Sequence, residues 1–163
     1  MLDPKMEHEL NEQINEEFYS SYLYLAMSTH FNAEGLQGFA HWLRAQSQEE
    51  YAHAMKIHDY INDHGGRVVL QAIKEPQGTY ESYAEVFNDV LAHERHITKR
   101  INTLVDLANQ LNDHATHVFL QWFVTEQVEE EGSAGEVLRK VELIGDSGPG
   151  LLALDREMHA RTG

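Results

Sequence analysis

Residues 39–61 read FAHWLRAQSQEEYAHAMKIHDYI, and this sequence contains the strongest signal of the protein's architecture. Its apolar side chains recur at the spacing of one face of an α-helix. They are Phe39, Trp42, Leu43, Ile57 and Ile61. Glu50 and His53 fall inside the same face, as does Gln46. Because a dry core does not tolerate a carboxylate without a partner, the stretch predicts a buried helix whose polar groups need neutralisation.

Three further segments share this periodicity, and together with the first they predict four long helices. Their approximate bounds are residues 5–34, 38–64, 80–107 and 113–143. Each helix would span about 40 Å at about 1.5 Å per residue. The 163 residues include three prolines, and we find no internal repeat or dividing linker. These features favour one all-α domain over residues 1–163, in the form of a four-helix bundle.

Each helix carries a carboxylate near the middle of its apolar face. The first face consists of Leu10, Ile14, Phe18, Ser21 and Leu25. Glu17 lies at the edge of that face, Glu94 lies at the centre of the third, and Glu130 lies with Gln127 inside the fourth. In a bundle of alternating helices these midpoints meet Glu50 at one height. No Lys or Arg has a matching inward position, and two divalent cations would balance four carboxylates. We therefore predict a dinuclear metal site.

The connections predict the topology. The segment between Asp63 and Thr79 is too long for a tight turn, so we expect a crossover along the bundle between the second and third helices. The short join at 108–113 indicates antiparallel neighbours. A short C-terminal fifth helix follows 147–150 and runs to about Met158. Because its own apolar residues are few, we expect this helix to pack against another subunit. These residues are Leu151, Leu152 and Leu154.

Composition limits the partners and the ligands. The formal charge of −15 opposes binding to nucleic acid, although an acidic surplus can serve solubility alone. No targeting segment or membrane-crossing stretch is visible, so we expect a cytoplasmic protein without a membrane partner. The chain has no cysteine, so oxygen and nitrogen ligands must hold any metal. Carboxylates with one imidazole suit iron(II) or manganese(II), and redox chemistry favours iron.

Four motifs resemble the haem-free ferritins of bacteria and archaea, and the resemblance extends over essentially the whole chain. They are NEEFYSSYLY at 15–24, EEYAHA at 49–54, ERHI at 94–97 and WFVTEQVEE at 122–130. Ferritin-like proteins bind di-iron centres inside a four-helix bundle. The resemblance implies a ferroxidase that oxidises iron(II) with dioxygen or peroxide and stores iron(III) as a mineral. It also implies a hollow homo-oligomeric cage of 24 subunits.

The resemblance further implies how the iron ions are held. Glu17, Glu50 and His53 would bind the first iron. Glu50 would bridge to a second iron, which Glu94 and Glu130 would hold. Metals about 3.5–4 Å apart can hold both ends of an oxygen molecule.

Further residues have implied roles around these two irons. Gln127 would lie near the second iron. Glu49, Glu126 and Glu129 would form a third iron site that shares one carboxylate with the second. Tyr24, two turns after the first glutamate, would hydrogen-bond near the centre and supply an electron. Without the resemblance, Tyr24 is better explained as a packing residue, and Glu126 and Glu129 are equally explained as part of an acidic surface that continues to Glu131.

The sequence departs from bacterioferritins and rubrerythrins in two respects. Those proteins have a second Glu-x-x-His motif. Here the residue three positions after Glu94 is Ile97 and not histidine, and Gln127 precedes Glu130 in place of a Glu-x-x-His motif. The second iron site would be oxygen-rich and weaker, which suits iron as a substrate that moves on. Ala52 stands beside the first motif in place of the haem-binding methionine of bacterioferritins, so we expect no haem.

Two classes of function remain open from the sequence. The first is the iron-storing ferroxidase. The second is a non-catalytic helical scaffold or buffer that binds zinc or manganese. The Glu50–His53 motif alone is a weak signal on an acidic helix, whereas four coordinated carboxylates are a strong one. We expect the remaining histidines, His93 and His96 among them, to be solvated.

Overall fold

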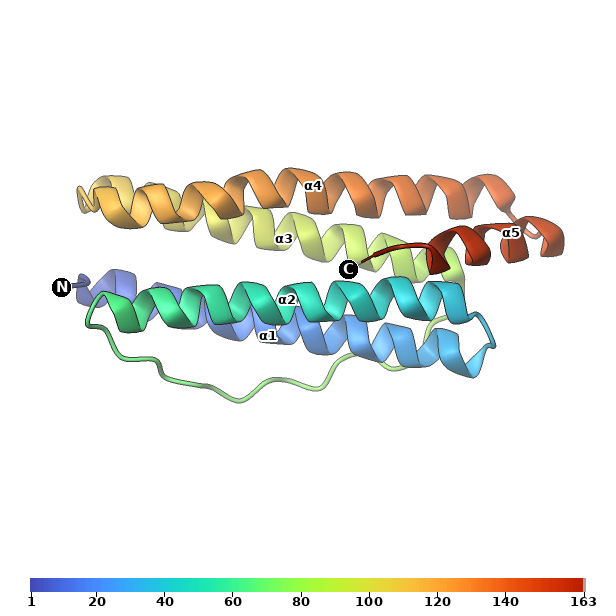
Figure 1. Cartoon of the computed structure of the whole chain (residues 1–163), viewed down its shortest axis with the longest axis horizontal. Coiled ribbons are helices and arrows are strands. Elements are labelled where there is room, and N and C mark those ends of the chain that lie inside the picture. The colour runs from blue at the N-terminus through green and yellow to red at the C-terminus, as the bar shows by residue number, and fades with distance from the viewer. Residues whose placement is uncertain (163) are drawn as a thin grey trace.

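The computed structural model describes residues 1–162 and is almost entirely helical. The helices are α1 (Pro4–Ala33), α2 (Gln37–Asp63), α3 (Tyr83–Gln110), α4 (His114–Ile144) and α5 (Gly148–His159). Within the described residues there is no strand. Figure 1 shows α1 beside α2 and α3 beside α4 along one long axis, with α5 at one end. The predicted all-α four-helix bundle with a short fifth helix is confirmed.

Polar side chains define where most helices begin. The carboxylates of Asp3 and Asp113 and the hydroxyls of Ser82 and Ser147 each accept a hydrogen bond from a backbone N–H in the first turn of the following helix. These bonds satisfy donors that have no partner inside the helix. After α1, Gly35 has a φ of +78°, a left-handed conformation that suits glycine at a tight helix end. The turn into α2 can therefore be short.

The segment between α2 and α3 runs along the outside of the bundle, beside α1 (Figure 1). Two asparagines of α1 hold it there. The Asn11 side chain donates to the carbonyl of Arg67 at 3.0 Å and accepts from the N–H of Val69 at 2.7 Å. Asn15 donates to the carbonyl of Ala72 at 3.1 Å. The predicted crossover is confirmed, and it connects opposite ends of the bundle.

The hydrophobic core consists of two clusters that are separated by polar residues. One cluster includes Phe31, Phe39 and Phe87, and the rings of Phe31 and Phe39 stack at 5.0 Å. The other cluster includes Ile57 and Ile101. Along each of the four long helices, the buried residues pass from one cluster to the other, and the polar midpoint lies between them. The bundle therefore contains a polar layer across its middle.

The buried face of α1 differs from the predicted one. Leu25, which we placed inward, is 43% exposed, whereas its neighbour Tyr24 is fully buried. Glu17 is 1% exposed and therefore lies within the buried face and not at its edge. Tyr24 contacts Glu94 and His93 of α3, so the buried face of α1 lies on the Tyr24 side of the helix and Leu25 lies outside it.

The prediction that α5 packs against another subunit needs correction. Leu154 and Met158 of α5 belong to the same core cluster as Phe39 of α2. The N–H of Phe39 donates to the carboxylate of Asp155 at 3.0 Å. Leu152, in contrast, is 58% exposed. The fifth helix thus packs on its own bundle. No described helix is long and apolar enough to span a membrane.

The close approach of α5 to α2 depends on Gly38. A Cβ at this position would lie 1.6 Å from the carbonyl oxygen of Asp155, whereas a Cβ at Gly132 of α4 would meet nothing within 4 Å. We expect Gly38→Ala to lower the stability by about 1–3 kcal/mol, the usual cost of overpacking. The matched Gly132→Ala variant would leave stability unchanged or raise it by up to about 1 kcal/mol. Thermal unfolding of both variants checks this, and equal melting temperatures would contradict it.

Candidate metal centre

Five ionisable side chains from the four long helices meet in the polar layer. Glu17, Glu50 and Glu94 are each 1% exposed, Glu130 is 5% exposed, and His53 is 4% exposed. Each long helix contributes one of the four carboxylates, as the periodicity predicted. Their positions follow from helix geometry, since a residue at the midpoint of each inward face reaches the same level of the bundle.

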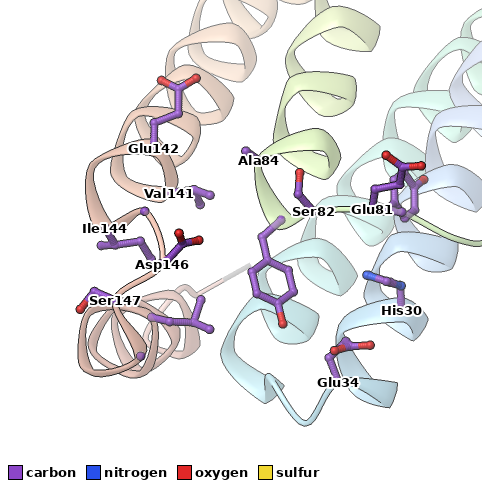
Figure 2. Close-up of a pocket in the computed structure, with 15 residues that line it drawn as sticks. His30, Glu34, Glu81, Ser82, Ala84, Val141, Glu142, Ile144, Asp146 and Ser147 are labelled. Carbon is purple, nitrogen blue, oxygen red and sulfur yellow. The ribbon is translucent and has the colours of Figure 1, made fainter.

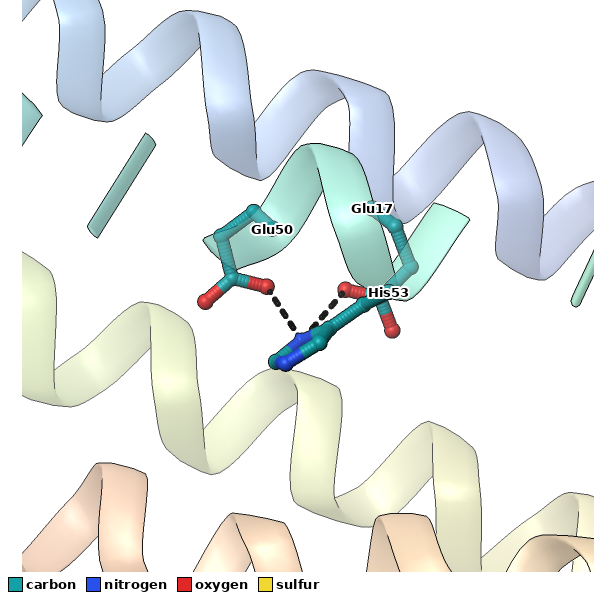
Figure 3. Close-up of side chains that lie close together, drawn as sticks. All are labelled: Glu17, Glu50 and His53. Carbon is teal, nitrogen blue, oxygen red and sulfur yellow. Dashed lines mark hydrogen bonds and ion pairs between the residues drawn. The ribbon is translucent and has the colours of Figure 1, made fainter. Parts of the chain in front are cut away.

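Glu17, Glu50 and His53 form the first group (Figure 3). The Nδ1 atom of His53 lies 3.1 Å from Oε2 of Glu50 and 4.0 Å from Oε2 of Glu17. That Glu17 oxygen is buried and has no hydrogen-bond partner. A buried carboxylate oxygen without a partner is costly, and a cation between these three side chains would satisfy it. The group therefore has ligand atoms that suit a metal ion, and one of its oxygens lacks a hydrogen-bond partner that the ion would replace.

Two further groups overlap the first. The second group consists of Glu50, Glu94 and Glu130, which each place one carboxylate oxygen within 4.8 Å of the others. The third group consists of a ring nitrogen of His53 and one carboxylate oxygen each of Glu126 and Glu130, within the same distance of one another. Glu50 belongs to two of the three groups, as do His53 and Glu130. Each of the three groups could hold a cation, and the shared carboxylates of Glu50 and Glu130 lie between neighbouring groups.

The three glutamates expected to form a third iron site do not all lie beside the buried carboxylates. Glu126 is half-buried, and its carboxylate lies 3.7 Å from Nε2 of His53. Glu49 instead forms an ion pair of 2.9 Å with Arg161, which follows α5. Glu129 is exposed. Among the described residues, neither Glu49 nor Glu129 belongs to any of the three groups. A cation that binds Glu49 in this arrangement would have to compete with the guanidinium.

Burial strongly affects the titration of the carboxylates. It is the largest cause that raises the pKa of Glu94 and of Glu130 from 4.5 to about 7. Burial, followed by the charge of neighbouring glutamates, raises the pKa of Glu17 and Glu50 well above 4.5. In the part of the chain that the structure describes, no Lys or Arg forms an ion pair with any of these four. The layer is therefore short of positive charge.

Two glutamines support the carboxylates, although neither was predicted from the sequence to belong to the site. Nε2 of Gln13 donates to Glu17 at 2.9 Å, and Nε2 of Gln46 donates to Glu50 at 3.1 Å. Gln46 also donates to Glu130. Each glutamine precedes its glutamate by four residues, the spacing of neighbours on a helix surface. A glutamine four residues before an inward glutamate is the signal that would have identified both.

Tyr24 and Gln127 both contact Glu94. The Tyr24 hydroxyl, fully buried, donates to one carboxylate oxygen of Glu94. Nε2 of Gln127 donates to the other at 3.1 Å. Burial and the charge of Glu94 raise the pKa of Tyr24 well above 10, so it remains a donor. The expectation that Tyr24 hydrogen-bonds near the centre agrees with this geometry, and Gln127 directs its amide nitrogen toward the carboxylate.

His93 is not the solvated residue that we expected. It is partly buried, and its Nε2 lies 2.6 Å from the hydroxyl of Ser20. Burial lowers its pKa from 6.5 to about 4, so the ring is neutral at neutral pH. Its ring packs edge-on against Tyr24. His96 is exposed and pairs with Glu16 at 2.9 Å, as a surface histidine would.

A separate cavity of about 690 Å³ lies at the end of the bundle near α5. Figure 2 shows His30 and Glu34 on one side of it and Asp146 and Ser147 on the other. None of the residues that line this cavity belongs to the three groups of the polar layer. The three groups of candidate metal ligands therefore lie inside the bundle and not in this cavity.

Comparison with known proteins places this geometry in a family. The ferritin-like domain family matches residues 7–144. A bacterial non-heme ferritin of Bacteroides fragilis is 45% identical over 148 residues, which cover 91% of this chain and 93% of that protein. A bacterial non-heme ferritin of Staphylococcus epidermidis is 40% identical over 162 residues, covering 99% and 98% of the two chains.

Solved structures agree with the sequence relatives. An open pore ferritin from the archaeon Archaeoglobus fulgidus has a TM-score of 0.98 and 48% identity, and the match covers 99% of this chain and 100% of that one. A second structure, described as a humanized archaeal ferritin, is 49% identical with the same TM-score. The fold, the buried carboxylate layer and these relatives together show that the chain belongs to the ferritin family.

Proposed function

We propose that this protein stores iron and is a ferroxidase, with the buried carboxylate layer as its reaction centre. The main support for the proposal is the set of three overlapping groups, in which Glu50, His53 and Glu130 each belong to two groups. A scaffold has no use for four uncompensated carboxylates in its core, because burying them costs stability. A protein whose substrate is a cation gains from them, because they attract iron into a site that is already formed.

The charges support two iron(II) ions as the substrate. Two divalent ions would balance Glu17, Glu50, Glu94 and Glu130, with His53 as the nitrogen ligand. Glu50 belongs to both of the groups concerned and would bridge the ions. Two iron(II) ions supply two electrons, which with two protons reduce dioxygen to hydrogen peroxide or peroxide to two molecules of water. The iron(III) products then leave the centre.

Turnover depends on how tightly each position holds iron. The first group contains a histidine nitrogen, whereas Glu50, Glu94 and Glu130 offer only oxygen. We propose that this second position binds iron more weakly and releases it after oxidation. Glu126, half-buried beside His53, would accept iron on its way from the centre. If a third iron(II) ion is oxidised at the position beside Glu126, Tyr24, hydrogen-bonded to Glu94, would supply the fourth electron, and four electrons with four protons reduce dioxygen to two molecules of water.

Storage requires a container, and the relatives support one. The Archaeoglobus fulgidus protein is described as an open pore ferritin, and a closed form of it has been engineered. We propose that copies of this chain likewise assemble into a hollow homo-oligomeric shell of 24 subunits. The relatives from Bacteroides and Staphylococcus are described as non-heme ferritins, which supports a centre that works without haem.

The ferroxidase proposal is tested by stopped-flow absorbance after metal-free protein is mixed with iron(II) in air. We expect fast oxidation in the parent and a loss of at least about 100-fold in Glu50→Ala and His53→Ala, because each removes a ligand shared by two positions. Glu142→Ala, which removes an exposed carboxylate from α4, is the matched control and would keep the parent rate. Equal slow oxidation in all four proteins, with the variants changed only in melting temperature, would favour the non-catalytic zinc or manganese scaffold.

The raised pKa values predict how stability depends on pH without metal. From pH 4.5 to about 7 the folded chain retains protons on Glu94 and Glu130 that the unfolded chain releases. The contribution of these two groups to the free energy of unfolding therefore falls as pH rises through this window and changes little above it. For one group the full change is about 3 kcal/mol.

Glu94→Gln removes one such group and isolates its effect. We expect this variant to match the metal-free parent near pH 4.5 and to exceed its stability by up to about 3 kcal/mol at pH 8. Thermal unfolding of both proteins after metal removal, at several values of pH, measures the difference. Parallel curves for the parent and the variant would contradict the assignment of the raised pKa to Glu94.

A further inference from the structure

A chain of hydrogen bonds connects the metal centre to a cation near the surface. Nε2 of Gln13 donates to Oε1 of Glu17 at 2.9 Å. The other end of the same amide, Oε1 of Gln13, accepts from Nε of Arg100 at 3.0 Å. Gln13 is completely buried, and Arg100 on α3 is partly buried. The guanidinium therefore reaches the centre through one intervening side chain.

The chemistry of these groups fixes the orientation of the amide. A guanidinium can only donate hydrogen bonds, so it must face the carbonyl oxygen of Gln13. The NH₂ group of the amide then points toward Glu17. If the amide were flipped, Arg100 and the NH₂ group would be two facing donors, and the carbonyl would face a carboxylate. Arg100 thus selects the orientation in which Gln13 donates to Glu17.

This orientation also distinguishes the two oxygens of Glu17. Oε1 is occupied by Gln13, whereas Oε2 has no hydrogen-bond partner and lies 4.0 Å from Nδ1 of His53. Oε2 is therefore the oxygen left free for a cation. Outer partners of this kind orient metal ligands, and their loss commonly costs 10–100-fold in metal affinity.

We propose that Arg100 is a positioning residue for the metal centre, and that it acts through Gln13 to hold Glu17 with Oε2 directed at the cation. The proposal rests on the proposed metal-binding function of this layer. Gln46, which supports Glu50 in the same way, provides a contrast, since its own carbonyl oxygen is buried without a partner. Only the glutamine beside Glu17 is anchored by a cation among the described residues.

Lys99 offers a matched control for Arg100. Both side chains line a cavity of about 500 Å³ between α1 and α3, together with Lys5 and His96. Lys99 is exposed, and the described structure shows no hydrogen bond from its side chain to Gln13. Lys99→Met and Arg100→Met remove the same charge from the same cavity, but only Arg100→Met removes the bond to the amide. A difference between the two variants therefore reports the contact and not the general electrostatic field.

The test is a titration of the assembled, metal-free protein with cobalt(II), followed by calorimetry and by the visible absorption of the bound ion. We expect Arg100→Met to weaken the site that contains Glu17 by about 10-fold and to change the cobalt absorption spectrum. We expect Lys99→Met to remain within about twofold of the parent, with the parent's spectrum. Melting temperature and assembly are checked in each variant, so that a failure to fold is recognised.

A double-mutant cycle shows whether Arg100 acts through the amide. If it does, Arg100→Met weakens cobalt binding far less in a Gln13→Met background than in the parent, because the relay is already broken. Independent, additive effects, or equal effects of Arg100→Met and Lys99→Met, would overturn the proposal. Glu17→Ala serves as the reference. If it binds cobalt like the parent, the proposed metal centre itself fails, and that outcome is distinct from a failure of Arg100 alone.

Discussion

The structure depends on one physical constraint, which is that four glutamates share the dry interior of a helical bundle without a Lys or Arg partner among the described residues. Burial and mutual repulsion oppose their ionisation, so without metal the layer holds protons that it would lose in water. A metal ion bound at the proposed centre would replace those protons and remove the repulsion. The same feature that weakens the metal-free bundle would therefore give the proposed centre its affinity for cations.

The rest of the fold keeps this layer in place. The two hydrophobic clusters on either side of it set the positions of the four long helices along the bundle axis. Apolar packing therefore holds the carboxylates together although they repel one another. Gln13 and Gln46 then orient individual carboxylates, and Tyr24 and Gln127 hold both oxygens of Glu94. Ligands held by packed neighbours lose little freedom when the ion binds, which is the usual advantage of a preformed site.

The sequence predicted the bundle and its inward carboxylates because both follow from a period of 3.6 residues, and that period is strong over long helices. It did not predict the buried face of α1, where Leu25 proved exposed and Tyr24 proved buried against Glu94 and His93 of α3. Contacts between distant segments were also beyond it. Arg161 pairs with Glu49 across 112 residues of sequence, and α5 docks on α2 at Gly38, and periodicity carries no information about either.

The proposed centre can be located in crystals of the metal-free protein that are soaked anaerobically with iron(II) and measured at the iron absorption edge. Anomalous scattering locates the bound ions without assuming which residues hold them. The account predicts one peak between Glu17, Glu50 and His53 and a second between Glu50, Glu94 and Glu130. Iron bound only at surface carboxylates, with the buried layer empty at saturating iron(II), would contradict it.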